Sequence, residues 1–519
     1  MSQIKSGAIL SYLSILVTIV VTLLFTPILI KYLGQEEYGL YAMVGSLAAY
    51  LSILDMGLGN AIVRYTARNR VIGDLDSEAK MNGFFLILYT VIGILTVVIG
   101  IVAYNTAEVA FKNNFSDAEI SLVKMMIVII TITFSLSFPL SIFGAIMQAY
   151  EKFIVSKIVS IIRTIALPII SLPFLFLGYG ALTVVVISSI INILLLIFNV
   201  YYCISNLNIK FRFSIIDSDV LKEILGYSFF IFLGIVVDQV NWNTGQIILG
   251  IFSNTIAIAV FAIAIQFIRL YLYFSTSISM LLLPKVSMMV ANNVSSDELS
   301  KIMIKFGRIQ FMILSFILCG FILFGHQFIK MWVGEDFAEA YYMVILIMVP
   351  ITIPLIQNIG LIILQAKNLQ KFRSVVLILI AIFNLILSLL LVNNYGGVGI
   401  AFSIGISYIL GNSIVMNIYY YKKIKLNVLL FWKNIILLSI PIGSSLIGGF
   451  FINVFIASDS LLSILLKIFL FSVIYTSILW RFSLNSTEKK MIISILNSML
   501  KIKNRFSNLL NKFKRENIK

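Results

Sequence analysis

Long apolar stretches follow one another along almost the whole chain, with short polar connections between them. Each stretch has about 20 residues or more, which is the length that a helix with a rise of about 1.5 Å per residue needs to cross a hydrocarbon core of about 30 Å. The pattern predicts an all-α polytopic membrane protein with about fourteen transmembrane helices. The predicted spans are 7–30, 38–62, 81–104, 121–147, 157–177, 180–203, 223–249, 255–283, 306–329, 342–365, 374–393, 397–421, 433–456 and 461–482.

The composition agrees with this pattern. The chain has 519 residues, of which 60% are hydrophobic and 12% are charged, whereas soluble domains have about 45–50% apolar and about 25% charged residues. These values exclude an ordinary soluble protein. The first apolar segment is long and lacks a small-residue cleavage pattern, so we expect a retained helix rather than a signal peptide.

The formal net charge of +16 is a value that could indicate nucleic-acid binding. The positions of the basic residues are better explained by the orientation of the chain in the membrane. With a cytoplasmic N-terminus, most of the 38 Lys and Arg residues fall in inner connections and in the basic C-terminal tail. This asymmetry predicts that both termini are cytoplasmic, so we expect contact with the lipid bilayer and no nucleic-acid partner. The lysines on the outer side are Lys31, Lys112, Lys124, Lys330 and Lys467.

Pairs of short landmarks recur at an offset of 216 or 217 positions and in equivalent places relative to the predicted spans. Chance matches between common connection residues are the alternative explanation. Together the pairs favour two six-helix bundles related by a pseudo-two-fold axis along the membrane normal, as in parallel-repeat transporters. The pairs are Leu33-Gly34 with Leu249-Gly250, Gln148-Ala149 with Gln365-Ala366, and Gly180 with Gly397.

The predicted division of the chain follows from this repeat. Residues 1–205 form the N-terminal bundle, 206–425 the C-terminal bundle, and 426–482 add transmembrane helices 13 and 14. Residues 483–519 form a basic tail whose apolar positions recur at near-helical spacing. That spacing predicts an amphipathic helix on the inner membrane surface, with a solvated tail as the alternative. Two bundles about one axis enclose a cleft that can open alternately to either side, which is typical of transporters.

The seventh predicted span holds the most polar cluster of the chain, around Asp238, Asn241, Asn243 and Gln246. An aspartate at the membrane centre costs at least about 2.5–3.5 kcal/mol, so we expect these side chains to face water, protein or substrate. The sequence Asn-Trp-Asn-Thr-Gly at 241–245 is also expected to unwind the helix locally. A purely structural hydrogen-bond cluster between helices is the alternative.

Arg269 lies about midway along the eighth predicted span, too deep for its side chain to reach the membrane surface easily. One interpretation is an ion pair with Asp238 on the neighbouring helix. The other is that the guanidinium group binds a phosphate that enters the cleft. Both interpretations are compatible if the substrate phosphate displaces the Asp238 carboxylate from Arg269 at one stage of a transport cycle.

The second predicted span ends in LDMGLGNAIVR, residues 54–64, with Asp55 at membrane depth. Gly57 and Gly59 allow another backbone to approach closely. Asp55 either exchanges a proton or pairs with a basic residue, so Asp55 and Asp238 are the candidates for ion coupling.

Sequence features of an enzyme are missing. There is no G-x-x-x-x-G-K-[ST] phosphate loop. The one histidine, His326, has no metal-ligand partners of suitable type near it in the sequence, so we expect no metal and no cofactor. The external connections are short, whereas a membrane polymerase would be expected to devote a larger outer loop to chemistry. We therefore expect no catalytic activity.

Three segments and the duplicated plan resemble a known family. LGQEEYGLY at 33–41, LDMGLGNAIVR at 54–64 and NWNTGQIILG at 241–250 are similar to Wzx-type O-antigen and capsule repeat-unit flippases. These belong to the polysaccharide transporter branch of the multidrug/oligosaccharidyl-lipid/polysaccharide (MOP) exporter superfamily. The resemblance covers nearly the whole chain, implies a MATE-like arrangement of the two bundles, and does not specify the sugar.

The resemblance implies that an undecaprenyl-pyrophosphate-linked oligosaccharide moves from the cytoplasmic to the outer leaflet of the bacterial inner membrane by alternating access. H⁺ or Na⁺ is the implied coupling ion, and a polysaccharide polymerase and chain-length proteins are the implied partners. Arg64, Arg163 and Arg308, near the predicted inner mouth, are candidates for gathering the anionic head group, with a role in topology alone as the alternative.

Two other functions remain open from the sequence. A cation-coupled exporter of small molecules or drugs has the same fold, and a non-transporting partner in polysaccharide assembly has the same membrane topology. Export of small cations distinguishes the first, and full function after loss of both Asp238 and Arg269 distinguishes the second.

Overall fold

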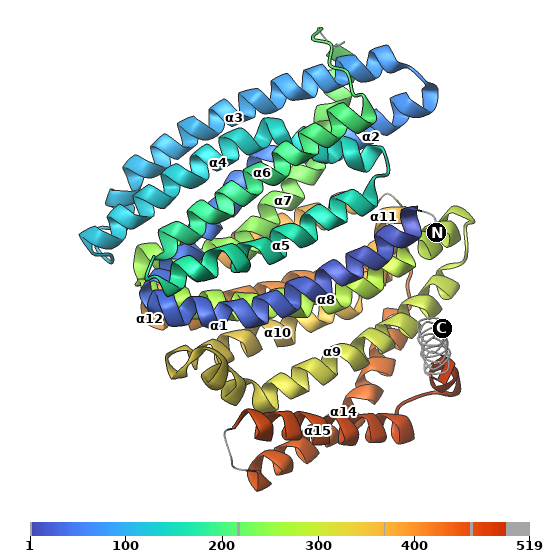
Figure 1. The fold of residues 1–519 in the computed structure, drawn as a ribbon. Coiled ribbons are helices and arrows are strands. Elements are labelled where there is room, and N and C mark those ends of the chain that lie inside the picture. The colour runs from blue at the N-terminus through green and yellow to red at the C-terminus, as the bar shows by residue number, and fades with distance from the viewer. Residues whose placement is uncertain (1–2, 215–217, 368, 457–459, 492, 495–519) are drawn as a thin grey trace, which may run out of the picture.

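The computed structural model describes residues 3–214, 218–367, 369–456, 460–491 and 493–494, in which helices are the only regular secondary structure. The first half contains α1 (Gln3–Leu51), η1 (Ser52–Asp55), α2 (Leu58–Ile72), α3 (Leu75–Phe111), α4 (Asp117–Ala149), α5 (Phe153–Phe176) and α6 (Ala181–Leu207). The second half contains α7 (Ser218–Phe252), α8 (Thr255–Ala291), α9 (Ser296–Val333), η2 (Glu335–Phe337), α10 (Ala340–Ile356), α11 (Asn358–Ala366), α12 (Gln370–Tyr408), η3 (Ile409–Val415), α13 (Met416–Tyr419) and η4 (Tyr420–Ile424). The chain continues with α14 (Val428–Phe455) and α15 (Leu461–Phe482) (Figure 1).

Twelve helical stretches among the described residues are long and apolar enough to cross a membrane. Two of them, Leu10–Ile72 and Gln370–Ile424, have 63 and 55 residues. At about 1.5 Å per residue a single helix of that length would far exceed a bilayer. Each is broken at a glycine with positive φ, Gly34 (φ 76°) and Gly396 (φ 50°), so each makes two crossings. The arrangement therefore agrees with the prediction of about fourteen spans.

Local sequence signals explain where several helices begin. Asp74 caps α3 by accepting a hydrogen bond from the Ser77 backbone N–H at 2.9 Å. The Ser77 hydroxyl also donates to Asp74, and these bonds hold the pKa of the Asp74 carboxyl below its ordinary value. Ser116 and Glu119 form a capping box at the start of α4.

The landmark pairs of the sequence fall at equivalent places in the two halves. Gln148-Ala149 ends α4, and Gln365-Ala366 ends α11. Gly180 caps the start of α6, and Gly397 directly follows the break in α12. These positions agree with two six-helix bundles of the same order, and the domain boundaries at 205 and 425 stay predictions.

The helices α14 and α15 pack beside α9, at the lower edge of Figure 1. α1 begins and α15 ends at the same end of the molecule, as an even number of crossings requires. We call the opposite end, where the first arm of α1 (3–33) stops, the Gly34 end. The apolar positions of the predicted amphipathic tail, Ile492, Leu496, Met499, Phe506, Leu510 and Phe513, lie outside the described residues.

The second arm of α1 (35–51) packs closely on α7 and α8. Gly39 faces the backbone of Thr255 at the start of α8, and a Cβ at Gly39 would overlap the Thr255 carbonyl oxygen. Further along, a Cβ at Gly250 of α7 would lie 2.7 Å from the sulfur of Met43. Close backbone contact at small residues is a common way for membrane helices to associate.

We predict that Gly39→Ala lowers the free energy of unfolding by about 1–3 kcal/mol, because the added methyl group must displace the backbone of α8. Gly45→Ala is the matched control on the same helix, since a Cβ there meets nothing within 4 Å. The control is expected to be neutral or stabilising by up to about 1 kcal/mol, as alanine favours helix. Thermal denaturation of the purified protein in detergent measures both, and equal effects would contradict this packing.

Candidate functional site

The polar segment of α7 is helical throughout. The expected unwinding at 241–245 is wrong, because α7 is continuous from Ser218 to Phe252. Some of its polar side chains have partners on other helices or one turn away, whereas the buried Asn241 Nδ2 has no hydrogen-bond partner among the described residues. Asn241 Oδ1 accepts a hydrogen bond from Asn384 of α12 at 3.2 Å, and Asn243 donates to Gln239 one turn earlier.

A break occurs instead in the second crossing, between η1 and α2. The chain makes a 3₁₀ turn at Ser52–Asp55 and then passes through two left-handed residues, Met56 (φ 51°) and Gly57 (φ 73°). A left-handed conformation costs a residue with a Cβ about 1–2 kcal/mol, so the surrounding packing must hold Met56 in place. A Cβ at Gly57 would lie 2.6 Å from the Ile231 side chain and 3.4 Å from the Ser228 carbonyl oxygen, so α7 approaches closely there. The nearest atoms to a Cβ at Gly59, in contrast, are in the Asp55 and Tyr89 side chains.

Asp55 lies at this break and is half-buried. Its Oδ1 accepts a hydrogen bond of 2.5 Å from the hydroxyl of Tyr89 on α3. No basic side chain forms an ion pair with Asp55 within the described ranges, so its partner is a tyrosine rather than a cation. The carboxylate therefore has one specific donor beside an interruption of the helix backbone.

Asp238 and Arg269 lie at the same depth. α7 ends and α8 begins at the Gly34 end, and each residue is fourteen positions along its helix from that end, which corresponds to about 21 Å. Both side chains are exposed rather than sealed between helices. They do not pair: the Arg269 Nη2 donates to Asn243 Oδ1 at 2.9 Å, and no ion pair of either residue occurs in the part of the chain that the structure describes.

Arg373 is a site residue that sequence reasoning missed. The predicted spans 342–365 and 374–393 leave it in a connection, but α12 begins at Gln370, so Arg373 belongs to the first turn of a helix. Its charge acts on Asp238 of α7 and on Tyr408 and Tyr420 of the last crossing of the second bundle. The buried Arg373 Nε has no hydrogen-bond partner among the described residues. The helix start could have been anticipated from the apolar run that follows, but the direction of the side chain could not.

Hydrogen bonds between the predicted bundles concentrate toward the Gly34 end, and we call this set the α1–α7–α8 seam. Gln266 of α8 donates to Thr26 at 2.9 Å and accepts from Tyr38 at 3.5 Å, both on α1. Ser46 bonds to Gln246, and Tyr50 bonds to Thr244. Gln246, a predicted binding residue, is thus part of the seam. These bonds join the two halves near the Gly34 end, and closure of that end is what the labelling experiment below tests.

Fewer polar contacts cross at the opposite end. Arg64 Nη2 lies 3.4 Å from Glu223 Oε1, with both side chains about half exposed. The guanidinium group of Arg64 also lies 4.9 Å from the ring of Tyr227. Arg163 is exposed on α5. The roles of Arg64 and Arg163 at the inner mouth stay predictions.

Arg308 does not lie at that mouth. It is 9% exposed, and its Nε and Nη2 bind the two carboxylate oxygens of Glu488 at 2.7 and 3.0 Å. Its Nη2 also donates to the Ser483 carbonyl at 2.9 Å. The prediction of a head-group contact is wrong here, because the guanidinium group already anchors the segment after α15 to α9.

Paired six-helix bundles with arginine and aspartate side chains at mid-depth have the architecture of a membrane transporter. The chain belongs to the polysaccharide biosynthesis protein family, whose model matches residues 4–290. This family and the fold confirm the resemblance to the MOP exporter superfamily. No curated protein sequence matches the chain.

Solved structures share the fold at low sequence identity. The lipid II flippase MurJ in an inward closed conformation is 18% identical with a TM-score of 0.71, and the match covers 91% of this chain and 98% of that one. An inward-facing MATE-family multidrug resistance transporter is 13% identical with a TM-score of 0.65, covering 81% and 99%. A MOP superfamily transporter from Pyrococcus furiosus is 15% identical with a TM-score of 0.57, covering 81% and 97%. The all-helical, MATE-like fold is thereby confirmed.

We predict that cysteines at Asp238 and Arg269 react quickly with a membrane-impermeant thiol reagent applied from the side on which α1 begins. Asn241→Cys is the control on the same helix and should react much more slowly, because Asn241 is 2% exposed. The native Cys203 and Cys319 are buried and add little background. Labelling of the two site cysteines only from the Gly34 side would contradict the closure described above.

Proposed function

We propose that the protein is a flippase that moves undecaprenyl-pyrophosphate-linked oligosaccharide repeat units from the cytoplasmic to the outer leaflet by alternating access. The observation that carries this proposal is Arg269. Its guanidinium group is exposed about 21 Å from the Gly34 end and is bonded to a neutral amide rather than to a carboxylate. Membership in the polysaccharide biosynthesis family supports the class of substrate.

The chemistry of the substrate fits such a site. A pyrophosphate and several sugars cannot cross hydrocarbon without a polar path, whereas a polyprenyl tail can stay in the lipid. A guanidinium group without a carboxylate partner offers planar donors that match a phosphate. An aspartate or arginine facing lipid at this depth is unfavourable, so we infer that Asp238 and Arg269 face a water-accessible space between the bundles.

Arg373 adds a second guanidinium group whose charge acts on Asp238, and Asn243 and Gln239 extend the polar surface along α7. Two arginines and one aspartate leave a net positive charge around this part of α7. Such a charge attracts an anionic head group and disfavours a cationic drug. The proposal therefore takes the lipid-linked oligosaccharide over the cation exporter.

Alternating access requires the α1–α7–α8 seam to open. A neutral hydrogen bond contributes about 0.5–1.5 kcal/mol net, so the few bonds of the seam hold the Gly34 end shut by a few kcal/mol. Substrate shifts this equilibrium only by as much as it binds the open form more tightly than the closed one. If the N-terminus is cytoplasmic, the closed end is the outer end, and the head group enters from the inside.

The membrane potential and an ion gradient supply the driving force in this proposal. An anionic head group moving outward gains about 2.3 kcal/mol per charge per 100 mV when the inside is negative. H⁺ or Na⁺ entering through Asp55 or Asp238 then supplies the return step. Asp55 is suited to this because it lies at the break of the second crossing with a single tyrosine donor.

We predict that Arg269→Ala reduces flipping by at least about tenfold, which corresponds to the loss of a charge-assisted hydrogen bond. Arg269→Lys should keep part of the activity because it keeps the charge. Arg212→Ala is the control, since Arg212 is an exposed arginine that pairs with Asp76 outside the site. The measurement is the amount of lipid-linked repeat unit that stays on the cytoplasmic side of cells carrying each variant.

Three results would contradict the proposal. Normal surface polysaccharide after deletion of the gene would exclude a flippase role. Wild-type activity of both Arg269 variants would remove Arg269 from the site. Altered drug susceptibility with unaltered polysaccharide would favour the exporter instead.

We also predict that Asp55→Asn or Asp238→Asn changes how flipping depends on the ion gradient, because the amide carries no charge and cannot exchange a proton at neutral pH. The measurement is flipping in vesicles with imposed pH or sodium gradients. Tyr89→Phe serves as a second variant at Asp55, since it removes the donor and leaves the carboxylate. An unchanged response in both aspartate variants would show that these carboxylates are structural.

A further inference from the structure

Lys467 is a buried ammonium group that pairs with none of the described acidic side chains. It lies six residues into α15, about 9 Å from the start of the helix, and is 1% exposed. Its Nζ donates to Gln327 Oε1 of α9 and Asn453 Oδ1 of α14, each at 2.9 Å. No ion pair of Lys467 is found among the residues that the structure describes.

The two amide oxygens accept hydrogen bonds from the ammonium group but do not neutralise its charge. An ammonium group has three N–H donors, and the two amides accept two of them. Lysine is almost never fully buried unless it is paired with an opposite charge. Arg308 on the same helix α9 shows the usual solution, since it is buried against both oxygens of Glu488. Among the residues that the structure describes, Lys467 therefore keeps one N–H donor and a positive charge without an acidic partner.

A cavity lies where that donor can be used. Lys467, Asn453 and Gln327 line a cavity of about 620 Å³ together with Lys330 and His326. Its volume is within the range of about 300–1,000 Å³ typical of ligand sites. Lys330 already pairs with Glu335 at 2.6 Å, so Lys467 is the cation in this lining whose charge is not neutralised by a described carboxylate.

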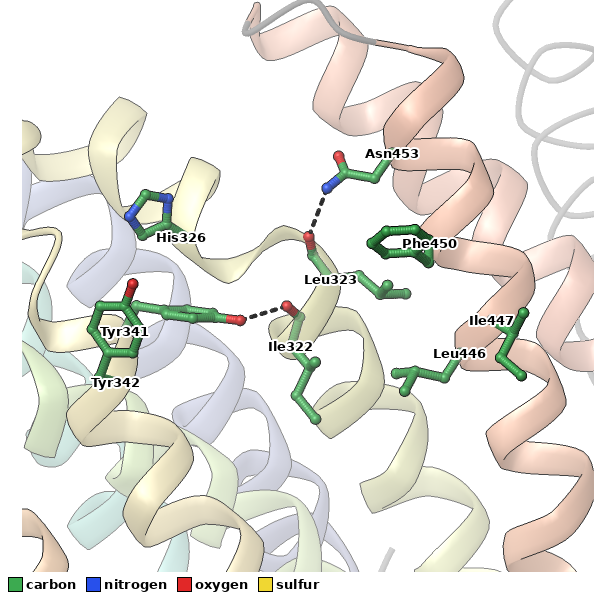
Figure 2. Close-up of a pocket in the computed structure, with 9 residues that line it drawn as sticks. All are labelled: Ile322, Leu323, His326, Tyr341, Tyr342, Leu446, Ile447, Phe450 and Asn453. Carbon is green, nitrogen blue, oxygen red and sulfur yellow. Dashed lines mark hydrogen bonds between the residues drawn. The ribbon is translucent and has the colours of Figure 1, made fainter.

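An aromatic and apolar cavity of about 530 Å³ adjoins this one, and the two share Leu323, His326 and Asn453. Figure 2 shows Tyr341 and Tyr342 on one side and Phe450 with Leu446 on the other. Asn453 donates to the Leu323 carbonyl at 3.3 Å, which places its Oδ1 toward Lys467. A polar chamber next to an aromatic one suits an amphiphile with a charged end.

We propose that this pair of cavities binds a phosphate group at Lys467, carried by a lipid head group whose apolar part lies along Phe450 and Ile447 of α14. A free phosphate ion has the same chemistry and is the other source that the test separates. The site lies between α9, α14 and α15 at the Gly34 end, apart from Asp238 and Arg269. It therefore does not depend on the proposed transport function.

The test uses the purified full-length protein in detergent and compares three probes by native mass spectrometry and by shift of the melting temperature. The probes are dioleoylphosphatidylglycerol, dioleoylglycerol with the same tails and no phosphate, and inorganic phosphate. Wild type and Lys467→Arg should bind phosphatidylglycerol, and Lys467→Gln about tenfold more weakly, as expected for the loss of one charge-assisted hydrogen bond. Lys124→Gln is the control, since Lys124 is a lysine toward the same end that pairs with Glu108.

Each possible result of this test either supports or overturns the proposed phosphate site. Binding of phosphatidylglycerol that depends on Lys467, without binding of inorganic phosphate, identifies a lipid head group, and equal binding of inorganic phosphate identifies the free ion. Equal affinity of wild type and Lys467→Gln for every probe overturns the site. Photo-crosslinking of wild type with a phosphatidylglycerol analogue needs no variant, and labelling that omits the peptides around Leu323–Met331 and Leu446–Asn453 also overturns it.

Discussion

The absence of water in the hydrocarbon core constrains every other feature of this protein. Each polar group at membrane depth must find its partner within the protein or face a wet space. The α1–α7–α8 seam meets this requirement with side chains alone: Ser46 meets Gln246, and Tyr50 meets Thr244. The bonds that give these polar groups their partners also hold the two halves together near the Gly34 end. One set of hydrogen bonds therefore serves both purposes.

Arg308 and Arg269 both lie inside the protein or deep in the membrane, but their hydrogen-bond partners differ. Arg308 is held by both oxygens of one carboxylate and by the Ser483 carbonyl, so its charge is neutralised inside the protein. Arg269 has one bond to a neutral amide and an exposed surface. Since a single amide leaves most of the guanidinium donors and all of its charge available, the difference in partners, not in residue type, separates an anchor from a candidate binding group.

The sequence predicted the spans and the repeat well, because apolar length and landmark spacing are local properties of the chain. It predicted unwinding in α7, where Asn241 and Asn243 instead bond to Asn384 and Gln239 within a regular helix. Partners of this kind come from tertiary packing. The same limit explains the error at Arg308, whose partner Glu488 is 180 positions away, and the omission of Arg373, whose direction only the fold determines.

The left-handed residues Met56 and Gly57 divide the second crossing into two helical segments, and the helical hydrogen bonds are not continuous from one segment to the other. The segment before the break, 35–51, is held to α7 and α8 by the seam, whereas α2, after the break, packs mainly against α3 and α4 of its own bundle. The break lets the chain change direction between these two contacts without interrupting a regular helix. Asp55 therefore lies where the part of this crossing that is held by the second bundle meets the part that is held by the first, and its donor Tyr89 belongs to α3 of the first bundle.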